Sequence, residues 1–245
     1  MVFLILLNLV WGNSMPRLFS VHIENDEFHK KIGGGLPAGT ICVIKGDHGS
    51  GKSVVCQRIV YGLLKNDVKV SYVSTQLTTK DFVKQMFSLG YDVTRDIIAG
   101  KLDFFPVYPL INELDERNDY SKRLISGKAL FEKDVIVIDS FSSLLKFDIS
   151  DKAAIDLVGF FKRVAATDKV IVLTVLDKEL DEDTLLEIES AASLIIETST
   201  KKFGADLKNM MVIKKYNFAL QQYSKQTAFR VEPKLGLVVE IAAVA

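Results

Sequence analysis

Residues 46–53 combine glycines with a lysine and a serine in an order that suits phosphate binding. They read GDHGSGKS and match the pattern G-x-x-x-x-G-K-[ST]. Glycines permit positive φ angles, so that backbone N–H groups turn inward around an anion at the positive end of a following helix. The lysine adds a charge for the outer phosphates, and the serine hydroxyl is a Mg²⁺ ligand in this pattern. We therefore expect a nucleotide-phosphate site at Gly46, Asp47, His48, Gly49, Ser50, Gly51, Lys52 and Ser53, with Mg²⁺ at Ser53. His48 stands at a variable position of the pattern, and we expect no catalytic role for it.

An acidic residue follows a second apolar segment. Residues 135–138 (VIVI) are four consecutive β-branched residues, which predict a central parallel strand. Asp139 stands at the carboxyl end of that strand, where ligands of open α/β sheets bind, and we expect it to hold Mg²⁺ through water. Ser140, Ser142 and Ser143 come next, and two interpretations stay open for them: contact with a γ-phosphate, or a serine-rich turn. We include Ser140 in the nucleotide site.

The order of apolar segments predicts the fold that positions these residues. Short β-rich runs alternate with segments of helical periodicity, which predicts an α/β fold with a mainly parallel sheet flanked by helices on both faces. After Asn209, strands follow one another without helices, so we expect an antiparallel extension at the C-terminus. The predicted strands are 40–45, 68–74, 102–108, 135–138, 170–175, 194–197, 211–216, 227–231 and 236–241, and the predicted helices are 52–65, 78–89 (capped by Thr78 or Thr79), 122–132 and 153–166.

Composition limits the class of protein. The chain has 245 residues, of which 48% are hydrophobic and 25% charged, so it is neither disordered nor collagen-like. We expect one domain over residues 16–245. The 31 basic and 31 acidic side chains balance, which removes a global attraction to nucleic acid or acidic lipid. Cys42 and Cys56 lie in apolar stretches typical of buried thiols, which fits a reducing, cytoplasmic compartment.

Residues 1–15 form an unusual apolar segment. The stretch from Met1 to Val10 contains one polar residue, Asn8. The run is too short to span a bilayer, and no basic region precedes it as in a secretory signal. Three interpretations remain: a mis-assigned start with Met15 as the true first residue, which we favour, an interfacial anchor, or a strand that docks on the core.

The motifs together resemble those of the KaiC/RadA branch of the RecA-like ATPases. The resemblance is carried by residues 33–40 (GGGLPAGT), the loop 46–53 and the strand VIVIDS, and it covers nearly the whole chain from about Phe19. Within that branch, residues 72–80 (YVSTQLTTK) resemble the ATP-binding proteins of the archaellum, the archaeal flagellum. The resemblance implies a RecA-like P-loop NTPase core that binds ATP and Mg²⁺ at a subunit edge and forms hexameric rings.

The same resemblance implies partners and a location. Such a protein lies in the cytoplasm, peripheral to the inner side of the membrane and beneath the archaellum motor. Its neighbours there are the motor ATPase FlaI, the polytopic membrane protein FlaJ and the ring-forming protein FlaX. No nucleic acid is expected among its partners.

The segment after the second strand departs from the wider family. Active KaiC-like ATPases carry acidic residues there, one of which polarises the attacking water, whereas this chain has Thr75 and Gln76. A positioned general base contributes ~10²–10⁴ in rate, so we expect slow hydrolysis or none. Gln76 is able to orient water, as the glutamine of Ras-like enzymes does, if a partner supplies an arginine. We therefore include Thr75 and Gln76 in the nucleotide site, with Gln76 and Asp139 as candidate catalytic residues.

Two stretches of opposite charge follow. From Asp177 to Glu197 there are eight acidic residues and one lysine, and from Lys201 to Arg230 seven basic residues and one aspartate. They are either two solvated faces or complementary edges of neighbouring subunits in a ring, whose assembly would then depend on salt. Lys214 and Lys215 stand where KaiC relatives place a Lys-x-Arg that reaches the neighbour's phosphate, but this chain has no arginine there.

Three functions fit these patterns. The leading one is an ATP-binding regulator, in which bound Mg-ATP orders the segments 75–79 and 140–143 and gates the interaction with FlaI. The alternative is an ATPase or a KaiC-like autokinase that phosphorylates a hydroxyl of its own ring. A DNA-dependent, recombinase-like ATPase is a weaker third hypothesis, because few aromatic residues interleave with the basic stretch.

The roles of two site residues separate experimentally. Lys52→Ala is expected to abolish nucleotide binding, because it removes the charge that faces the outer phosphates. Gln76→Ala should leave binding intact, because this residue is assigned to water rather than to phosphate. Titration with a fluorescent ATP analogue measures both affinities, and an equal loss in the two variants would contradict the assignment.

Overall fold

The computed structural model describes residues 16–107, 120–146, 151–203 and 206–240. The N-terminal segment 1–15, with the three interpretations given for it, lies outside these ranges, as do Tyr108 and Ile241 at the ends of two predicted strands. Within the described ranges, no helix combines the length and the apolar character needed to cross a membrane.

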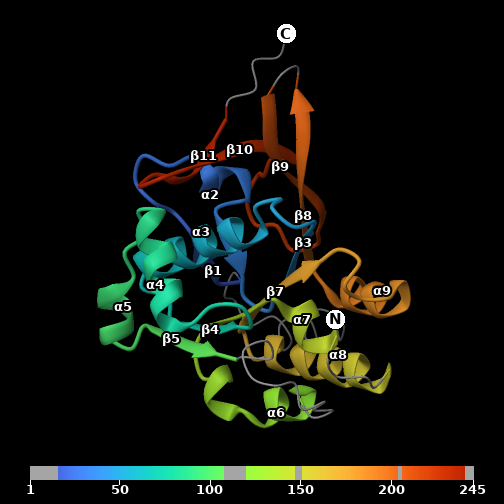
Figure 1. Cartoon of the computed structure of the whole chain (residues 1–245). Coiled ribbons are helices and arrows are strands. Elements are labelled where there is room, and N and C mark those ends of the chain that lie inside the picture. The colour runs from blue at the N-terminus through green and yellow to red at the C-terminus, as the bar shows by residue number, and fades with distance from the viewer. Residues whose placement is uncertain (1–15, 108–119, 147–150, 204–205, 241–245) are drawn as a thin grey trace, which may run out of the picture.

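A large sheet forms the centre of the molecule (Figure 1). Its nine strands are β3 (Ile41–Gly46), β4 (Val70–Ser74), β5 (Leu102–Pro106), β6 (Val135–Asp139), β7 (Val170–Leu176), β8 (Leu194–Phe203), β9 (Asp206–Tyr216), β10 (Gln226–Glu232) and β11 (Gly236–Val239). They lie in the order β11-β10-β9-β8-β3-β7-β6-β4-β5. From β8 to β5 all neighbours pair in parallel, whereas β9, β10 and β11 are added antiparallel beyond β8. The predicted α/β class, with a parallel core and a C-terminal antiparallel extension, is confirmed.

Helices pack on the two faces of this sheet (Figure 1). Successive residues of β3 alternate between the faces: Cys42 and Ile44 belong to the core that includes α3 (Lys52–Lys65), and Ile41 and Val43 to the core that includes α8 (Asp151–Ala165). The central parallel strands are therefore covered on both faces and mainly apolar. The remaining elements are β1 (Leu18–Ser20), which pairs with β2 (Gly35–Pro37), and α2 (Phe28–Lys31), α4 (Thr79–Ser88), α5 (Thr94–Ile98), α6 (Tyr120–Ser126), the 3-10 helix η1 (Lys128–Phe131), α7 (Phe141–Lys146) and α9 (Glu182–Ala191).

Some predicted elements differ from those observed. The helix expected over 122–132 is divided at Gly127 into α6 and η1, because glycine is unfavourable inside a helix. Strand β8 continues beyond residue 197 because pairing with β9 supplies its hydrogen bonds. Helix α9 was not predicted in the acidic stretch; Asp181 caps it by accepting the N–H of Thr184 at 2.8 Å. The elements β1, β2, α2, α5 and α7 are too short for a periodicity argument.

A buried arginine fixes the position of α3. The Arg58 side chain is fully buried, and its Nε donates to Asp26 Oδ2 at 2.8 Å while its Nη1 donates to the carbonyl oxygen of Val21 at 3.2 Å. The ring of Phe28 lies 5.0 Å from the guanidinium carbon. A buried charge is stable only beside its partner, so this pair anchors the helix that carries Lys52 at its start.

Removing the partner of Arg58 is expected to destabilise the fold. Asp26→Asn should lower the free energy of unfolding by about 3 kcal/mol, because the guanidinium charge then stays buried without a counter-charge. Glu27→Gln is the matched control, since the ion pair of Glu27 with Lys30 is 62% exposed on both sides and water screens it. Urea unfolding measures both variants. Equal midpoints would contradict the importance of the buried pair.

Candidate functional site

The loop 46–53 joins β3 to α3 at the carboxyl end of the parallel strands. Gly51, with φ +90°, precedes the first helical residue and has no side chain with which to cap the helix, so the first N–H groups of α3 are free to bind a ligand. A Cβ at Gly51 would lie 2.8 Å from the ring of Phe229 on β10. The Ser50 hydroxyl bonds the carbonyl oxygen of Asp47 and the hydroxyl of Thr198, both at 2.7 Å, and fastens the loop to β8.

Lys52 turns back into the curve of the loop. Its Nζ donates to the carbonyl oxygen of Asp47 at 2.7 Å. Burial lowers the pKa of Lys52, while the charges of Asp177, Asp139, Asp47 and Glu179 oppose that change. The ammonium thus lies where a chain of phosphates would pass, and a bound polyanion would supply a charge-assisted hydrogen bond to it.

Asp139 is held on both carboxylate oxygens. The hydroxyl of Thr174 donates to its Oδ1 and the hydroxyl of Tyr72 to its Oδ2, each at 2.6 Å. Burial, reinforced by the charge of Asp139, raises the pKa of Tyr72 well above its ordinary value, so the phenol keeps its proton and acts as donor. Each carboxylate oxygen retains a lone pair for a water molecule. The peptide bond between Asp139 and Ser140 is cis.

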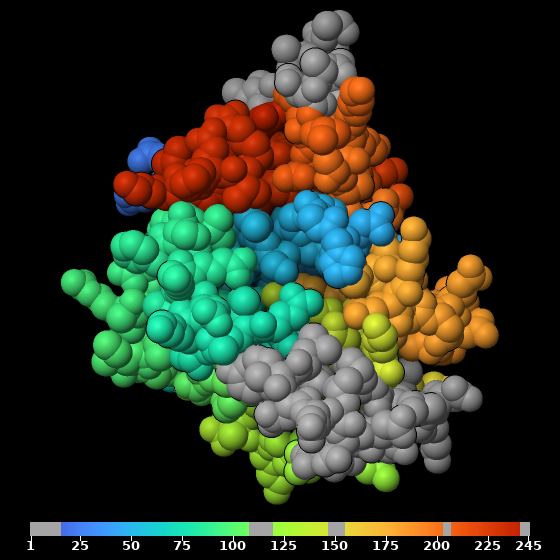
Figure 2. Space-filling model, in the orientation of Figure 1, coloured from blue at the N-terminus to red at the C-terminus, as the bar shows by residue number. Residues whose placement is uncertain are grey.

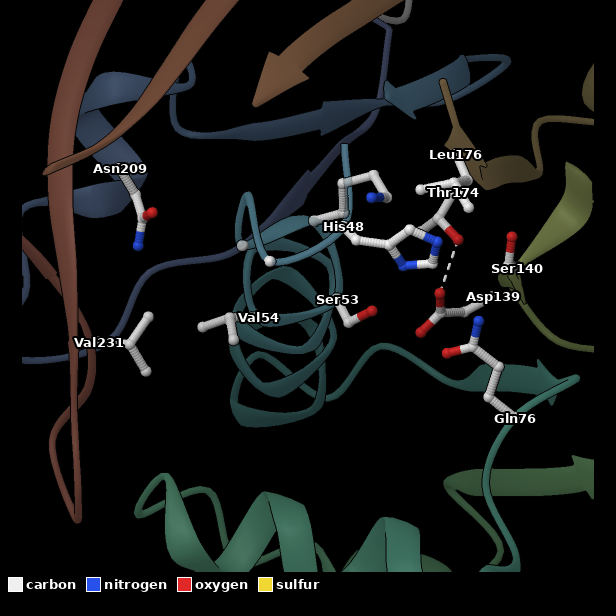
Figure 3. Close-up of a pocket in the computed structure, with 13 residues that line it drawn as sticks. His48, Ser53, Val54, Gln76, Asp139, Ser140, Thr174, Leu176, Asn209 and Val231 are labelled. Atoms are coloured by element: carbon white, nitrogen blue, oxygen red, sulfur yellow. Dashed lines mark hydrogen bonds between the residues drawn. The ribbon is translucent and has the colours of Figure 1, made fainter. Parts of the chain in front are cut away.

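A cavity of about 450 Å³ opens between these elements (Figure 3). Asp139, Gln76 and Ser140 lie at one end of it and Asn209 and Val231 at the other (Figure 3). In Figure 2 the phosphate loop (blue) reaches the surface between the C-terminal strands (orange to red) and α4 (blue-green). The lining residues are His48, Gly49, Gly51, Lys52, Ser53, Val54, Gln76, Asp139, Ser140, Thr174, Leu176, Asn209 and Val231.

Eight of the predicted site residues line this cavity, whereas Gly46, Asp47, Ser50 and Thr75 do not. Thr75 is buried; its N–H donates to the carbonyl oxygen of Asp139 at 2.9 Å, and its hydroxyl oxygen accepts the N–H of Ser140, the residue after β6, at 3.0 Å. Thr75 therefore fixes the segment that carries Asp139. The contact between Thr75 and nucleotide stays a prediction.

A chain of hydroxyl groups leads away from the cavity. Ser140 Oγ lies 2.9 Å from Ser142 Oγ, which lies 2.6 Å from Glu179 Oε2. Ser143 donates to the same carboxylate oxygen at 3.1 Å. Glu179 follows β7, so two segments distant in the sequence meet here.

Sequence reasoning missed several residues of the site. Thr174 carried a recognisable signal, because it is a polar hydroxyl inside an otherwise apolar strand, whereas Tyr72 lies on a strand that also contains two serines and carried none. Asn209 and Val231 carried none, since nothing local shows that the extension borders the phosphate loop. Glu179 was counted only as one of the acidic residues of its stretch.

Charges of the two charged stretches pair within the chain. Glu197 on β8 lies between Lys45 on β3, at 4.0 Å, and Lys214 on β9, at 3.4 Å. Lys45 also pairs with Glu189 at 2.7 Å, and Lys215 donates to carbonyl oxygens at the end of α9. The sheet order thus neutralises part of this charge within one subunit, and Lys214 and Lys215 both have partners in their own chain.

These features fit a nucleoside triphosphate with Mg²⁺. The open N-terminus of α3 and Lys52 match a chain of phosphates. The Ser53 hydroxyl and the Asp139 carboxylate line the same cavity and are the oxygen ligands that Mg²⁺ prefers. The phosphate loop follows β3, and Asp139 ends β6, a parallel strand two places from β3 in the sheet. This arrangement defines a P-loop NTPase with a RecA-like fold.

Comparisons with known proteins place the chain more narrowly. The family model "ATPase: KaiC" matches residues 22–240. One relative, the archaeal flagellar ATP-binding protein FlaH of Methanocaldococcus jannaschii, is 46% identical over 93% of this chain and 98% of its own length. Another, the FlaH protein of Methanococcus voltae, is 42% identical over 92% of this chain and 98% of its own length. The chain belongs to the FlaH family within the KaiC-like ATPases.

Solved structures agree with this assignment. The crystal structure of the flagellar accessory protein FlaH from Methanocaldococcus jannaschii matches with a TM-score of 0.89 at 46% identity, over 92% of this chain and 100% of that one. A KaiC-like protein from Pyrococcus horikoshii, 20% identical, matches with a TM-score of 0.72 over 93% of this chain and 100% of that one. The second match shows the fold alone.

The phosphate loop offers a matched pair of glycine substitutions. Gly51→Ala is expected to weaken Mg-ATP binding about tenfold or more, because the added Cβ meets the Phe229 ring and holds the loop at a strained φ. Gly49→Ala is the control: its φ is +73°, but a Cβ there meets nothing within 4 Å. Isothermal titration calorimetry measures both, and an equal loss of affinity would contradict the packing argument.

Proposed function

We propose that this protein binds Mg-ATP as a regulatory component of the archaellum motor and hydrolyses ATP slowly or not at all. The observation that carries the proposal is that the phosphate loop, Lys52 and Asp139 line one cavity in a chain of the FlaH family. The name of its relatives, archaeal flagellar ATP-binding protein, supports both the ligand and the archaellum.

In this proposal each site residue has a defined task. The backbone of residues 46–53 and the ammonium of Lys52 bind the phosphates. Ser53 ligates Mg²⁺ directly and Asp139 does so through water; the ion would neutralise charge on the outer phosphates. Gln76, at the end of β4, orients water beside the γ-phosphate.

The lining of the cavity supports slow turnover. Among the described residues that line it, Asp139 alone is acidic, and both of its oxygens already accept hydrogen bonds. Gln76 stands where active KaiC-like ATPases place a carboxylate, and an amide orients water without taking its proton. A bound ATP would therefore persist long enough to act as a signal.

The proposal extends to partners and assembly. Bound nucleotide orders the segments around Gln76 and Ser140 and changes the surface offered to the motor ATPase FlaI, through its differential affinity for two states. FlaJ and FlaX are proposed as further neighbours, with the protein as a hexameric ring on the cytoplasmic side of the membrane. The support for this part is membership of the FlaH family.

A single-turnover experiment tests the proposal. Protein in excess over γ-labelled Mg-ATP is followed over hours while intact ATP, free phosphate and protein-bound phosphate are separated. We expect most ATP to stay intact and bound, with free phosphate appearing slowly, and we expect Lys52→Ala to retain no label. Failure of the wild-type protein to bind ATP would contradict the site, rapid turnover would contradict the regulatory role, and labelled protein would identify an autokinase.

A further inference from the structure

The hydroxyl chain beside the cavity has a defined direction. Ser142 Oγ accepts the N–H of Leu176 at 3.0 Å and donates its single proton to Glu179 Oε2 at 2.6 Å, because a carboxylate only accepts. The contact of 2.9 Å between Ser142 Oγ and Ser140 Oγ therefore needs the Ser140 proton. Hydrogen bonds run from Ser140 to Ser142 and end on the carboxylate of Glu179.

This direction determines what Ser140 presents to the cavity. Ser140 lines the cavity beside Gln76 and Thr174, while its proton points away from the cavity toward Ser142. Its oxygen therefore offers lone pairs alone, which accept a hydrogen bond from water and disfavour a phosphate oxygen. Ser142 is fully buried and Ser140 is 5% exposed. The hydrogen bond between their hydroxyls is therefore shielded from water, which strengthens it.

Glu179 is well placed to receive a proton. Besides the bond from Ser142 it accepts one from Ser143 at 3.1 Å, which holds the carboxylate against α7. Its charge acts on the Lys52 ammonium of the phosphate loop, so it belongs to the same electrostatic surroundings as the outer phosphates. It is connected to the cavity through Ser142 and Ser140, and it comes from the segment after β7 rather than from the end of β4, where Thr75 and Gln76 stand.

We propose that Glu179 is the terminal proton acceptor for ATP hydrolysis in this site, reached through Ser142 and Ser140. The inference rests on the proposed binding of ATP. The oxygen of a water molecule held by Ser140 forms a bond to the γ-phosphorus. At the same time the bond between the γ-phosphorus and the β,γ-bridging oxygen breaks, and the electron pair of that broken bond leaves with ADP. One proton of the water passes to Ser140 Oγ, the Ser140 proton to Ser142, and the Ser142 proton to Glu179 Oε2. Phosphate and ADP depart, and Glu179 returns the proton to solvent.

This route is consistent with slow turnover. Phosphoryl transfer passes through a loose transition state that needs a well-oriented water more than a strong base. Two serine hydroxyls separate the water from the carboxylate, so several hydrogen bonds must be aligned when the proton moves. A carboxylate in direct contact with water would need only one.

Variants of the chain test the proposal in the full-length protein by single-turnover phosphate release, with ATP affinity measured separately. Glu179→Gln and Ser140→Ala are expected to slow phosphate release by about 10²-fold with ATP affinity retained. Glu179→Asp, which keeps the carboxylate, should recover part of the rate. Ser143→Ala is the comparison variant: it removes a positioning hydrogen bond to the same carboxylate but takes no hydroxyl out of the Ser140–Ser142–Glu179 chain, so it should slow phosphate release much less than Ser140→Ala.

A solvent isotope measurement separates proton transfer from a structural role. The wild-type rate should fall in D₂O with a curved dependence on deuterium fraction, because several protons move together, and Ser140→Ala should lose that curvature. The proposal is overturned if the wild-type protein binds ATP but releases no phosphate, if Glu179→Gln keeps the wild-type rate, or if His48→Ala alone removes hydrolysis. Absence of ATP binding in the wild-type protein would instead contradict the proposed function.

Discussion

Hydrogen bonding among the parallel strands β3, β7, β6 and β4 is the constraint on which the site depends. The register pairs Gly46 with Leu176 and Ser74 with Asp139. Because parallel strands end at the same edge of a sheet, the phosphate loop, Asp139 and Gln76 meet there although they are far apart in the sequence. A slip in register would separate the lysine of the loop from the acidic residue that shares its cavity.

The end of the cavity near Asp139 is organised by buried hydroxyl groups. Tyr72 and Thr174 orient the Asp139 carboxylate, and Ser142 and Ser143 orient that of Glu179. In a buried environment such hydrogen bonds are strong, and leaving a member unpaired is unfavourable. Both carboxylates are therefore held in fixed positions.

The antiparallel extension belongs to the site as much as the parallel core does. Phe229 on β10 packs where Gly51 of the phosphate loop leaves room. Asn209 and Val231 complete the cavity at the end opposite Asp139. Lys214 on β9 pairs with Glu197 on β8, so the extension also neutralises charge that the linear sequence presents as two separate stretches.

Local pattern alone was sufficient for the α/β class, the helix over 52–65, the phosphate loop and Asp139, because glycine conformation, strand apolarity and helix periodicity act over a few residues. The sequence also placed Thr75 and Gln76 at the site. Only the packing decided that Thr75 is buried and accepts the N–H of Ser140, while Gln76 lines the cavity. The hydrogen bonds of Tyr72, Thr174 and Glu179 required the tertiary structure. Their partners lie tens of residues away, and a hydrogen bond between such groups is determined by strand order and register, which no local pattern encodes.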